Sequence, residues 1–316
     1  MTGTLPRTVR RRTAAVPTSD GARLHANAEG SEQAPVTVVL AHGWTLSQAA
    51  WDDVAALLAG PVADGALRLV RYDQRGHGRS TWPDPPPGTP VSIDRLGEDL
   101  ADVLDRLVPT GPVVLGGHSM GGMTIMCLAA ARPELFGDRV RGVALVSTSA
   151  GDLASDPRSA GGRMARIRPG VLTAALAGAA LVERLRGLVP PEHPRHRTMV
   201  RDLLYGADAT DEMVLEGARI MHASTVRSFV EFLPALGDHD KRAQLDALTR
   251  VPVEVFVGDS DKLTPERHSA RLAEALPGAR LHRVERTGHM LPQERPRLVA
   301  DGLLRLVAAA GGRDLA

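Results

Sequence analysis

The sequence contains a single cysteine, Cys127, in 316 residues. One cysteine cannot form an internal disulfide and cannot supply the several thiolates of a metal cluster, so both are excluded. Cys127 lies in an apolar stretch, where we expect it to pack in the interior rather than to react. A chain without disulfides suits a reducing compartment, and we expect a cytoplasmic protein.

An excess of charge of either sign is also missing. The 38 lysines and arginines almost balance the 37 aspartates and glutamates, which leaves a formal net charge of +1. No global electrostatic field would therefore attract a polyanion to this protein. We expect no nucleic-acid partner.

Long hydrophobic runs are absent as well. The apolar stretch at 170–182 is shorter than the roughly 20 residues that a membrane-spanning helix needs. The basic segment at 1–12 is not followed by the apolar stretch of roughly 7 to 15 residues that a signal peptide requires. We therefore expect neither a transmembrane helix nor a signal peptide, and we interpret 1–12 as a disordered basic tail.

The remaining sequence alternates between short apolar runs and segments of helical periodicity, which is typical of a parallel sheet with crossover helices. Residues 12–30 begin this order as an expected antiparallel hairpin at the sheet edge, with Asp20-Gly21 at its turn. Strands are then expected at 36–43, 66–73, 111–117, 140–149, 251–261 and 279–289. Helices are expected at 48–60, 92–108, 120–133, 265–278 and 294–310.

The alternation stops between 151 and 236, where strand patterns give way to helical patches separated by glycine, proline and arginine. We interpret this segment as an inserted helical cap, with one helix at 170–182 and another at 214–236. The predicted core then consists of 13–150 and 237–316.

The run "GHSMG" at 117–121 follows a predicted strand and opens a predicted helix. A corner packed so tightly tolerates only glycine two residues before and after the serine, and it exposes the serine hydroxyl at the carboxyl end of the sheet. A serine needs a base within hydrogen-bond reach, and that base needs an orienting group. Asp259 and Asp261 follow the next-to-last strand, and His289 follows the last one. Either aspartate fits the order Ser, Asp, His.

Five stretches of the chain carry a resemblance to one family. They are "HGW" at 42–44, "DQRGHGRS" at 73–80, "GHSMGG" at 117–122, "GDSDKLTP" at 258–265 and "GHM" at 288–290. The chain resembles the α/β-hydrolases that carry a helical cap. This resemblance implies a mostly parallel eight-stranded sheet with helices on both faces and the cap inserted.

The resemblance also implies roles for individual residues. Ser119 is the nucleophile, His289 the base and Asp261, rather than Asp259, the orienting acid. The backbone N–H groups of Trp44 and Met120 form the oxyanion hole. Neighbouring His42, Arg75, His77 and His118 are expected to brace the structure without a chemical role.

The function expected from this set is hydrolysis of a carboxylic ester through an acyl-enzyme on Ser119, with no cofactor and no metal. Apolar residues in the cap favour an apolar or lipid-like small-molecule ester, for which we expect Trp44, Met213, Met221 and Phe229 to line the binding site. Arginines around 170–182 also suggest weak contact between the cap and an anionic lipid surface.

Other functions remain open at this point. A thioesterase, lactonase, perhydrolase or C–C bond hydrolase would use the same three residues. A receptor-like member of the family would bind its ligand with little turnover. Dehalogenases and epoxide hydrolases are disfavoured, because in such enzymes an aspartate is expected where this chain has Ser119.

Overall fold

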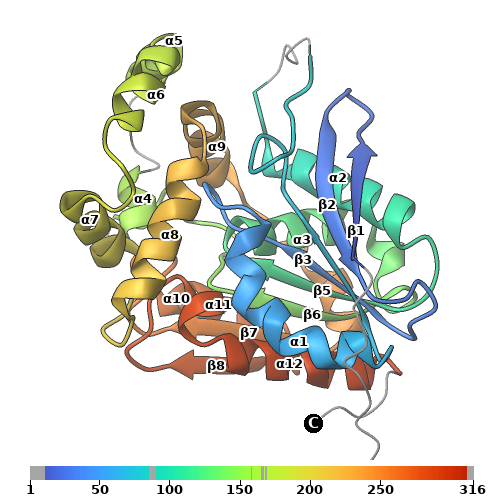
Figure 1. The fold of residues 1–316 in the computed structure, drawn as a ribbon. Coiled ribbons are helices and arrows are strands. Elements are labelled where there is room, and N and C mark those ends of the chain that lie inside the picture. Colours follow the sequence, from blue (N-terminus) through green and yellow to red (C-terminus); the bar gives the residue numbers. More distant parts are fainter. Residues whose placement is uncertain (1–10, 85–89, 158, 165–166, 168, 312–316) are drawn as a thin grey trace, which may run out of the picture.

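The computed structural model describes residues 11–84, 90–157, 159–164, 167 and 169–311 and is built on one eight-stranded sheet (Figure 1). The strands are β1 (Arg11–Pro17), β2 (Arg23–Glu29), β3 (Thr37–Ala41), β4 (Arg68–Tyr72), β5 (Val113–His118), β6 (Val140–Val146), β7 (Val253–Gly258) and β8 (Arg280–Val284). They lie in the order β1-β2-β4-β3-β5-β6-β7-β8. All neighbouring pairs from β4 to β8 are parallel, whereas β2 is antiparallel to both β1 and β4. The predicted mostly parallel, eight-stranded sheet is confirmed.

The first two strands form the predicted edge hairpin, and Gly21 occupies its turn with φ of 92°. The strand begins at Arg11, so the predicted tail extended two residues too far. Arg11 pairs with Glu29 across the hairpin, and the side chain of Arg12 reaches Glu32. These contacts hold two basic residues in the strand. The rest of the predicted tail, 1–10, lies outside the described residues.

Two groups of helices cover the two faces of the sheet (Figure 1). On one face lie α2 (Ile93–Leu107), α3 (Met120–Ala131) and α10 (Glu266–Ala275), and on the other lie α1 (Asp52–Ala63), α11 (Leu291–Glu294) and α12 (Pro296–Ala309). The apolar stripe of α2, with Leu96, Leu100 and Leu104 fully buried, shows why these segments form helices that pack on a sheet. Each such leucine contributes about 1.5–3 kcal/mol of burial free energy.

Between β6 and β7 the described residues contain helices and no strand. The helices are α4 (Ala160–Met164), α5 (Pro169–Ala177), α6 (Ala179–Gly187), α7 (Pro194–Leu204), α8 (Asp211–Ala223) and α9 (Val226–Asp238). We call α4–α9 the cap helices. Figure 1 shows them grouped at one side of the sheet, and α9 extends two residues past the predicted end of the cap at 236. Short 3-10 turns at Gln48–Trp51, Pro133–Leu135 and Asp246–Arg250 complete the structure.

The two long helices predicted in the cap were wrong, because each is broken in the middle. The stretch 170–182 divides at Gly178, which lies outside helical geometry between α5 and α6. The stretch 214–236 divides at Ser224 and Thr225, where the Thr225 hydroxyl accepts a hydrogen bond from Ser228 N and begins α9 as an N-cap. Among the described residues, no helix is both long enough and apolar enough to cross a lipid bilayer.

Candidate active site

Ser119 occupies the corner between β5 and α3. Its backbone has φ of 53° and ψ of −117°, a strained conformation for a residue with a side chain. Four hydrogen bonds hold it: Ser119 N donates to Val146 O at 2.9 Å, and Ser119 O accepts from Gly122 N at 2.9 Å, from Met123 N at 3.3 Å and from Thr148 Oγ1 at 2.7 Å. The corner exposes Ser119 to a cavity between the sheet and the cap helices.

The glycines on either side make this corner possible. A Cβ atom on Gly117 would lie 2.4 Å from Gly121 O, and a Cβ atom on Gly121 would lie 2.2 Å from Ala41 O. Both distances are far shorter than van der Waals contact. The expectation that only glycine fits these two positions is therefore met by the packing of the main chain itself.

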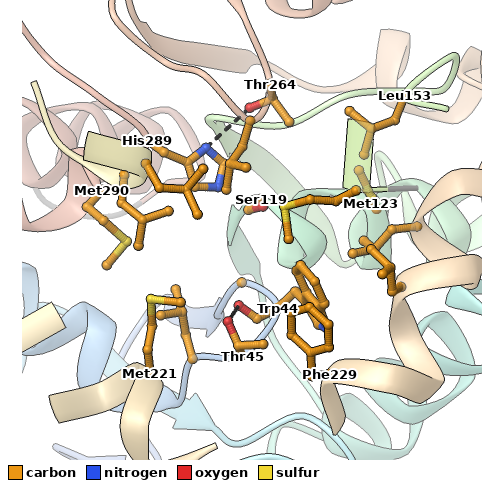
Figure 2. Close-up of a pocket in the computed structure, with 18 of the residues that line it drawn as sticks. Trp44, Thr45, Ser119, Met123, Leu153, Met221, Phe229, Thr264, His289 and Met290 are labelled. Atoms are coloured by element: carbon orange, nitrogen blue, oxygen red, sulfur yellow. Dashed lines mark hydrogen bonds between the residues drawn. The ribbon is translucent and has the colours of Figure 1, made fainter. Parts of the chain in front are cut away.

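His289 and Asp261 form a buried hydrogen-bonded pair. Nδ1 of His289 lies 2.8 Å from Oδ2 of Asp261, and both side chains are almost fully buried. The other oxygen of Asp261 accepts hydrogen bonds from the backbone N–H groups of Leu263 and Thr264, and the Thr264 hydroxyl donates to Oδ2. Because an ionised carboxylate only accepts hydrogen bonds, Nδ1 carries the proton and Nε2 of the neutral ring is left as an acceptor. Figure 2 shows the imidazole next to Ser119.

The two candidate aspartates occupy different environments. Asp259 is exposed, and Oδ1 of its carboxylate accepts a hydrogen bond from the neighbouring Ser260 hydroxyl. Asp261 is buried against His289. The structure therefore brings Asp261, and not Asp259, to the histidine.

Three contacts from other elements fix the His289 loop. His289 N donates to Leu204 O at the end of α7, and Gly288 N donates to the carboxylate of Glu294. Nε2 of His118 lies 2.8 Å from His289 O, and burial lowers the pKa of His118 to about 3, so this neutral ring donates its Nε2–H. His118 is thus a structural hydrogen bonder, as expected. Glu294 was not predicted, since nothing in its sequence surroundings marks it.

The backbone N–H groups of Trp44 and Met120 have no hydrogen-bond acceptor among the described residues. Met120 N is the first N–H group of α3, and such groups point out of the end of a helix. The loop of Trp44 is held by Thr45 N, which donates to Nε2 of His77, and by the Trp44 indole, which donates to Ser228 O in α9. Two unpaired donors thus flank Ser119.

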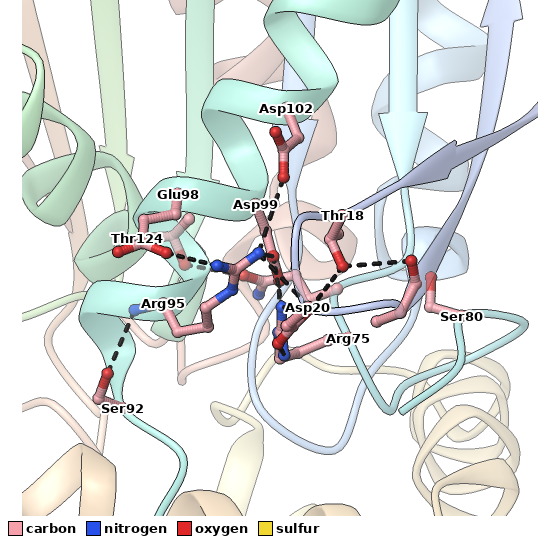
Figure 3. A network of polar contacts seen from close by, with 12 residues as sticks. Thr18, Asp20, Arg75, Ser80, Ser92, Arg95, Glu98, Asp99, Asp102 and Thr124 are labelled. Atoms are coloured by element: carbon pink, nitrogen blue, oxygen red, sulfur yellow. Dashed lines mark hydrogen bonds and ion pairs between the residues drawn. The ribbon is translucent and has the colours of Figure 1, made fainter. Parts of the chain in front are cut away.

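The segment 73–80 braces this loop through hydrogen bonds, as expected. Arg75 is buried and bonds Asp99 at 2.6 Å and Asp20 at 2.8 Å (Figure 3). Asp73 accepts a hydrogen bond from Gln48 N, just after the Trp44 loop. Removing one partner of a buried ion pair typically costs about 3–5 kcal/mol, so Arg75 contributes to the structure of the site without touching it.

The main cavity has a volume of about 270 Å³ and walls that are mostly apolar (Figure 2). Ser119 and His289 both line it, together with three of the four predicted substrate-binding residues: Trp44, Met221 and Phe229. The rings of Trp44 and Phe229 lie 4.6 Å apart. Within the described part of the chain, no group of three or more His, Cys, Asp or Glu side chains is placed to hold a metal ion.

Met213 was predicted to line the cavity and does not. It lies on α8 about 12 Å along the helix axis from Met221, because eight residues rise by about 1.5 Å each. There it packs in an apolar cluster around Tyr205, whose hydroxyl donates to Met213 O. The error arose because the prediction used the apolar character of α8 without its position over the sheet.

Several lining residues were not predicted. Met123, one turn after Ser119, and Met290, next to His289, could have been found from their spacing to the motifs. Gly43, Leu263 and Thr264 lie inside the quoted motifs, and Thr45 and Leu46 directly follow one of them, so their place was also within reach of the sequence. No sequence signal marks the remaining ones, which are Leu153, Met164, Met199, Leu203, Leu204, Leu233 and Leu236.

Comparison with known proteins extends these observations to most of the chain. The model of the alpha/beta hydrolase family matches residues 38–302. The chain belongs to the alpha/beta hydrolase family. The resemblance carried by the five sequence motifs is thereby confirmed, and the match covers β4 to β8, all but the first residue of β3, and the cap helices.

Proteins that are similar to this chain carry the names of different enzymes. Lipase LipV of Mycobacterium tuberculosis is 28% identical over 260 residues, which cover 77% of this chain and 92% of the lipase. The probable oxidoreductase EphD of the same organism is 26% identical over 95% of this chain but over only 50% of its own length, so this chain spans half of that relative. Among solved structures, the enol-lactonase of Burkholderia xenovorans superposes with a TM-score of 0.68 at 26% identity, over 94% of this chain and all of the lactonase.

Proposed function

We propose that this protein is a serine hydrolase that cleaves carboxylic esters of apolar or lipid-like substrates through an acyl-enzyme on Ser119. One observation carries the proposal: Ser119 and the Asp261-bonded His289 line the same apolar cavity. The names of two similar proteins support it, since a lipase and a lactonase both open ester bonds. The oxidoreductase name belongs to a relative of which this chain covers only half, so we infer no oxidoreductase activity from it.

In this mechanism the Ser119 hydroxyl attacks the ester carbonyl carbon while Nε2 of His289 takes its proton. Asp261 holds the ring and stabilises the imidazolium that forms. The negative charge on the carbonyl oxygen is stabilised by the N–H groups of Trp44 and Met120, and the loss of one such donor typically costs about 100- to 1000-fold in rate. The bond to the alcohol then breaks, and His289 returns the proton to the leaving oxygen.

The second half of the reaction frees Ser119. Water attacks the acyl-enzyme while His289 removes a proton from it, and the bond to Ser119 Oγ then breaks as His289 returns that proton to Oγ and the acid leaves. Among the described residues the Ser119 hydroxyl has no hydrogen-bond partner, so the mechanism requires it to turn toward Nε2 of His289. Such hydrogen bonds are often absent in free enzymes and form in the substrate complex.

Thioesters, lactones, peracid formation and C–C bonds remain alternative reactions of the same residues. The lactonase among the similar structures favours cyclic esters over the others. The receptor-like alternative differs in kind, because it predicts binding with little turnover.

The test is hydrolysis of p-nitrophenyl esters from acetate to palmitate by the wild type and by Ser119→Ala. We expect turnover with an optimum at medium or long acyl chains, and a loss of at least about 10⁴-fold in the variant. Turnover that survives in the variant would overturn the assignment of Ser119.

A fluorophosphonate probe separates the enzyme from the receptor-like alternative. The probe forms a covalent bond with an activated serine whether or not any ester is turned over. Mass spectrometry should find it on Ser119. A wild-type protein that neither reacts with the probe nor hydrolyses any ester would favour the receptor-like function.

A further inference from the structure

A second cavity of about 390 Å³ adjoins the main one. It lies among α5, α6, α7, α8 and α9, and we call it the outer cavity. The two cavities share four lining residues: Thr45, Met199, Met221 and Phe229. Since methionine side chains are flexible, Met199 and Met221 form a partition that a bound chain can displace.

The walls of the outer cavity combine apolar and polar side chains. The apolar ones include Leu172 from α5 and Val226 and Val230 from α9. Arg186 from α6, His196 from α7 and His222 from α8 also line it. The rings of the two histidines lie 5.8 Å apart. Polar donors from three helices thus meet in a cavity that is otherwise apolar.

These donors are largely unused within the described part of the chain. Arg186 donates one hydrogen bond, from Nη2 to Glu183 at 2.7 Å, although a guanidinium has five N–H groups. His222 makes no side-chain hydrogen bond to a described residue, and only Nδ1 of His196 has a partner, the backbone oxygen of Pro191 at 3.4 Å. Arg186 and His222 therefore have donor capacity to spare in the outer cavity, whereas the one N–H of a neutral His196 ring is directed at Pro191 O.

The acidic groups nearby are already engaged. Glu183 accepts from Arg186 with one oxygen and from Val226 N with the other, and Glu192 accepts from Arg219. Glu183 offsets part of the Arg186 charge, but neither carboxylate fills the donors that remain. An anion in the outer cavity would gain charge-assisted hydrogen bonds there.

We propose that the outer cavity binds the far end of the substrate, and that this end is an anionic group such as a carboxylate or a phosphate. The scissile ester lies at Ser119, an apolar segment passes Met199 and Met221, and the anion reaches Arg186 and His222. The proposal rests on the proposed esterase function, because it names the class of ester that the same site takes.

The test compares p-nitrophenyl monoesters of dicarboxylic acids with esters of monocarboxylic acids of equal length. Where the chain is long enough to reach Arg186, we expect kcat/KM for the acid-tipped ester to exceed that of its neutral partner about tenfold or more. Arg186→Gln should bring this ratio close to one. Arg184→Gln, an exposed position on the same helix that does not line the cavity, should keep it.

Phosphate-tipped esters of the same lengths identify the anion. A larger ratio for phosphate than for carboxylate assigns the site to phosphorylated substrates, and the reverse assigns it to dicarboxylic ones. A ratio of one or less at every length for both tips overturns the proposal. So does a high ratio that Arg186→Gln leaves unchanged, because the anion would then bind elsewhere.

Binding to Ser119→Ala keeps the proposal testable if no ester is turned over. Calorimetry on this variant compares the methyl monoester of a dicarboxylic acid with the neutral methyl ester of equal length. Tighter binding of the acidic ester, lost on adding Arg186→Gln, supports the outer site even if the esterase function fails. Equal affinities refute the outer site, whereas absent turnover concerns only the proposed reaction.

Discussion

The floor of the main cavity is held by main-chain contacts, whereas its roof is made of flexible side chains. On the floor, Ser119 N bonds Val146 O, and Gly121 packs directly against Ala41 O. The roof consists of side chains such as Met199, Met221 and Phe229 from three different helices. A substitution in the floor must move backbone atoms, whereas one in the roof changes only the volume and shape of the space. For the proposed esterase, a change in the floor would therefore affect the reaction, and a change in the roof would affect which ester fits.

The sharpest test of the floor is Asp261→Asn. An amide oxygen is a weaker acceptor than a carboxylate for the Nδ1–H of His289. The N–H groups of the amide also favour the other tautomer of the ring, which lacks the free Nε2 acceptor. We expect kcat on a p-nitrophenyl ester to fall by about 10⁴-fold, with the melting temperature changed by only a few degrees.

Asp259→Asn is the matched control, two residues earlier in the same loop. Its carboxylate is exposed and bonds only to Ser260 among side chains, so kcat should stay within about twofold of wild type. If Asp259→Asn were the more damaging change, the carboxylate chosen from the geometry would be the wrong one.

Gly121→Ala tests whether the floor is set by backbone packing. The added methyl group would lie 2.2 Å from Ala41 O, so α3 must shift and carry Met120 N and Ser119 with it. We expect kcat/KM to fall about 100-fold or more, since small displacements of reacting groups cost that much, and the melting temperature to fall clearly.

Gly60→Ala provides the comparison for a glycine without such a neighbour. Gly60 is exposed in α1, and a methyl group added to it would meet no atom within 4 Å apart from its chain neighbours and the backbone of its own helix. Alanine is a better helix former by up to about 1 kcal/mol, but here it would precede Pro61, whose ring disfavours helical geometry for a residue with a Cβ atom, so stability should change little and activity should not change. Equal losses in both variants would mean that the Gly121 contact does not control the site.

The roof is tested by Met221→Ala, which enlarges both cavities at their partition. We expect the preferred acyl chain to become longer or bulkier, with relative kcat/KM values along the ester series changing by about tenfold. Met213→Ala lies on the same helix outside the cavity. It should lower stability by roughly 1–3 kcal/mol and leave the chain-length profile as it is. If Met221→Ala and Met213→Ala gave the same chain-length profile, Met221 would not be part of the binding site.

The same contrast explains what could be predicted from the sequence. In the floor, residue identity is dictated by backbone geometry: glycine at 117 and 121 is required by close approach, and Asp261 and His289 follow strands whose ends meet at one edge. Such constraints leave a fixed spacing in the sequence. The fold and the placement of Ser119, Asp261 and His289 in one region followed from these spacings.

In the roof, residue identity is constrained by the shape of the cavity, and such a constraint leaves no fixed spacing of residues in the sequence. Met213 and Met221 belong to one apolar helix, yet only Met221 reaches the cavity. Apolar periodicity also runs on through the breaks at Gly178 and Thr225, because flanking residues on both sides suit a helix. For the break between α8 and α9, the capping hydroxyl of Thr225 is the signal that the sequence contains. The place where each cap helix packs depends on contacts between residues far apart in the chain.

The smallest effect is expected at the solvent-facing surface of the cap helices. Leu181, Leu185 and Leu188, on α6 and just after it, are 62%, 55% and 78% exposed, and Arg184 lies among them. We propose that this face rests weakly on anionic lipid, since an arginine near such a surface contributes ~1 kcal/mol and apolar side chains add to it. Vesicles containing anionic lipid should sediment part of the protein at low salt, vesicles of neutral lipid less, and the double variant Leu181→Ser/Leu185→Ser severalfold less. Equal sedimentation with and without vesicles would limit the function of the cap to enclosing the substrate.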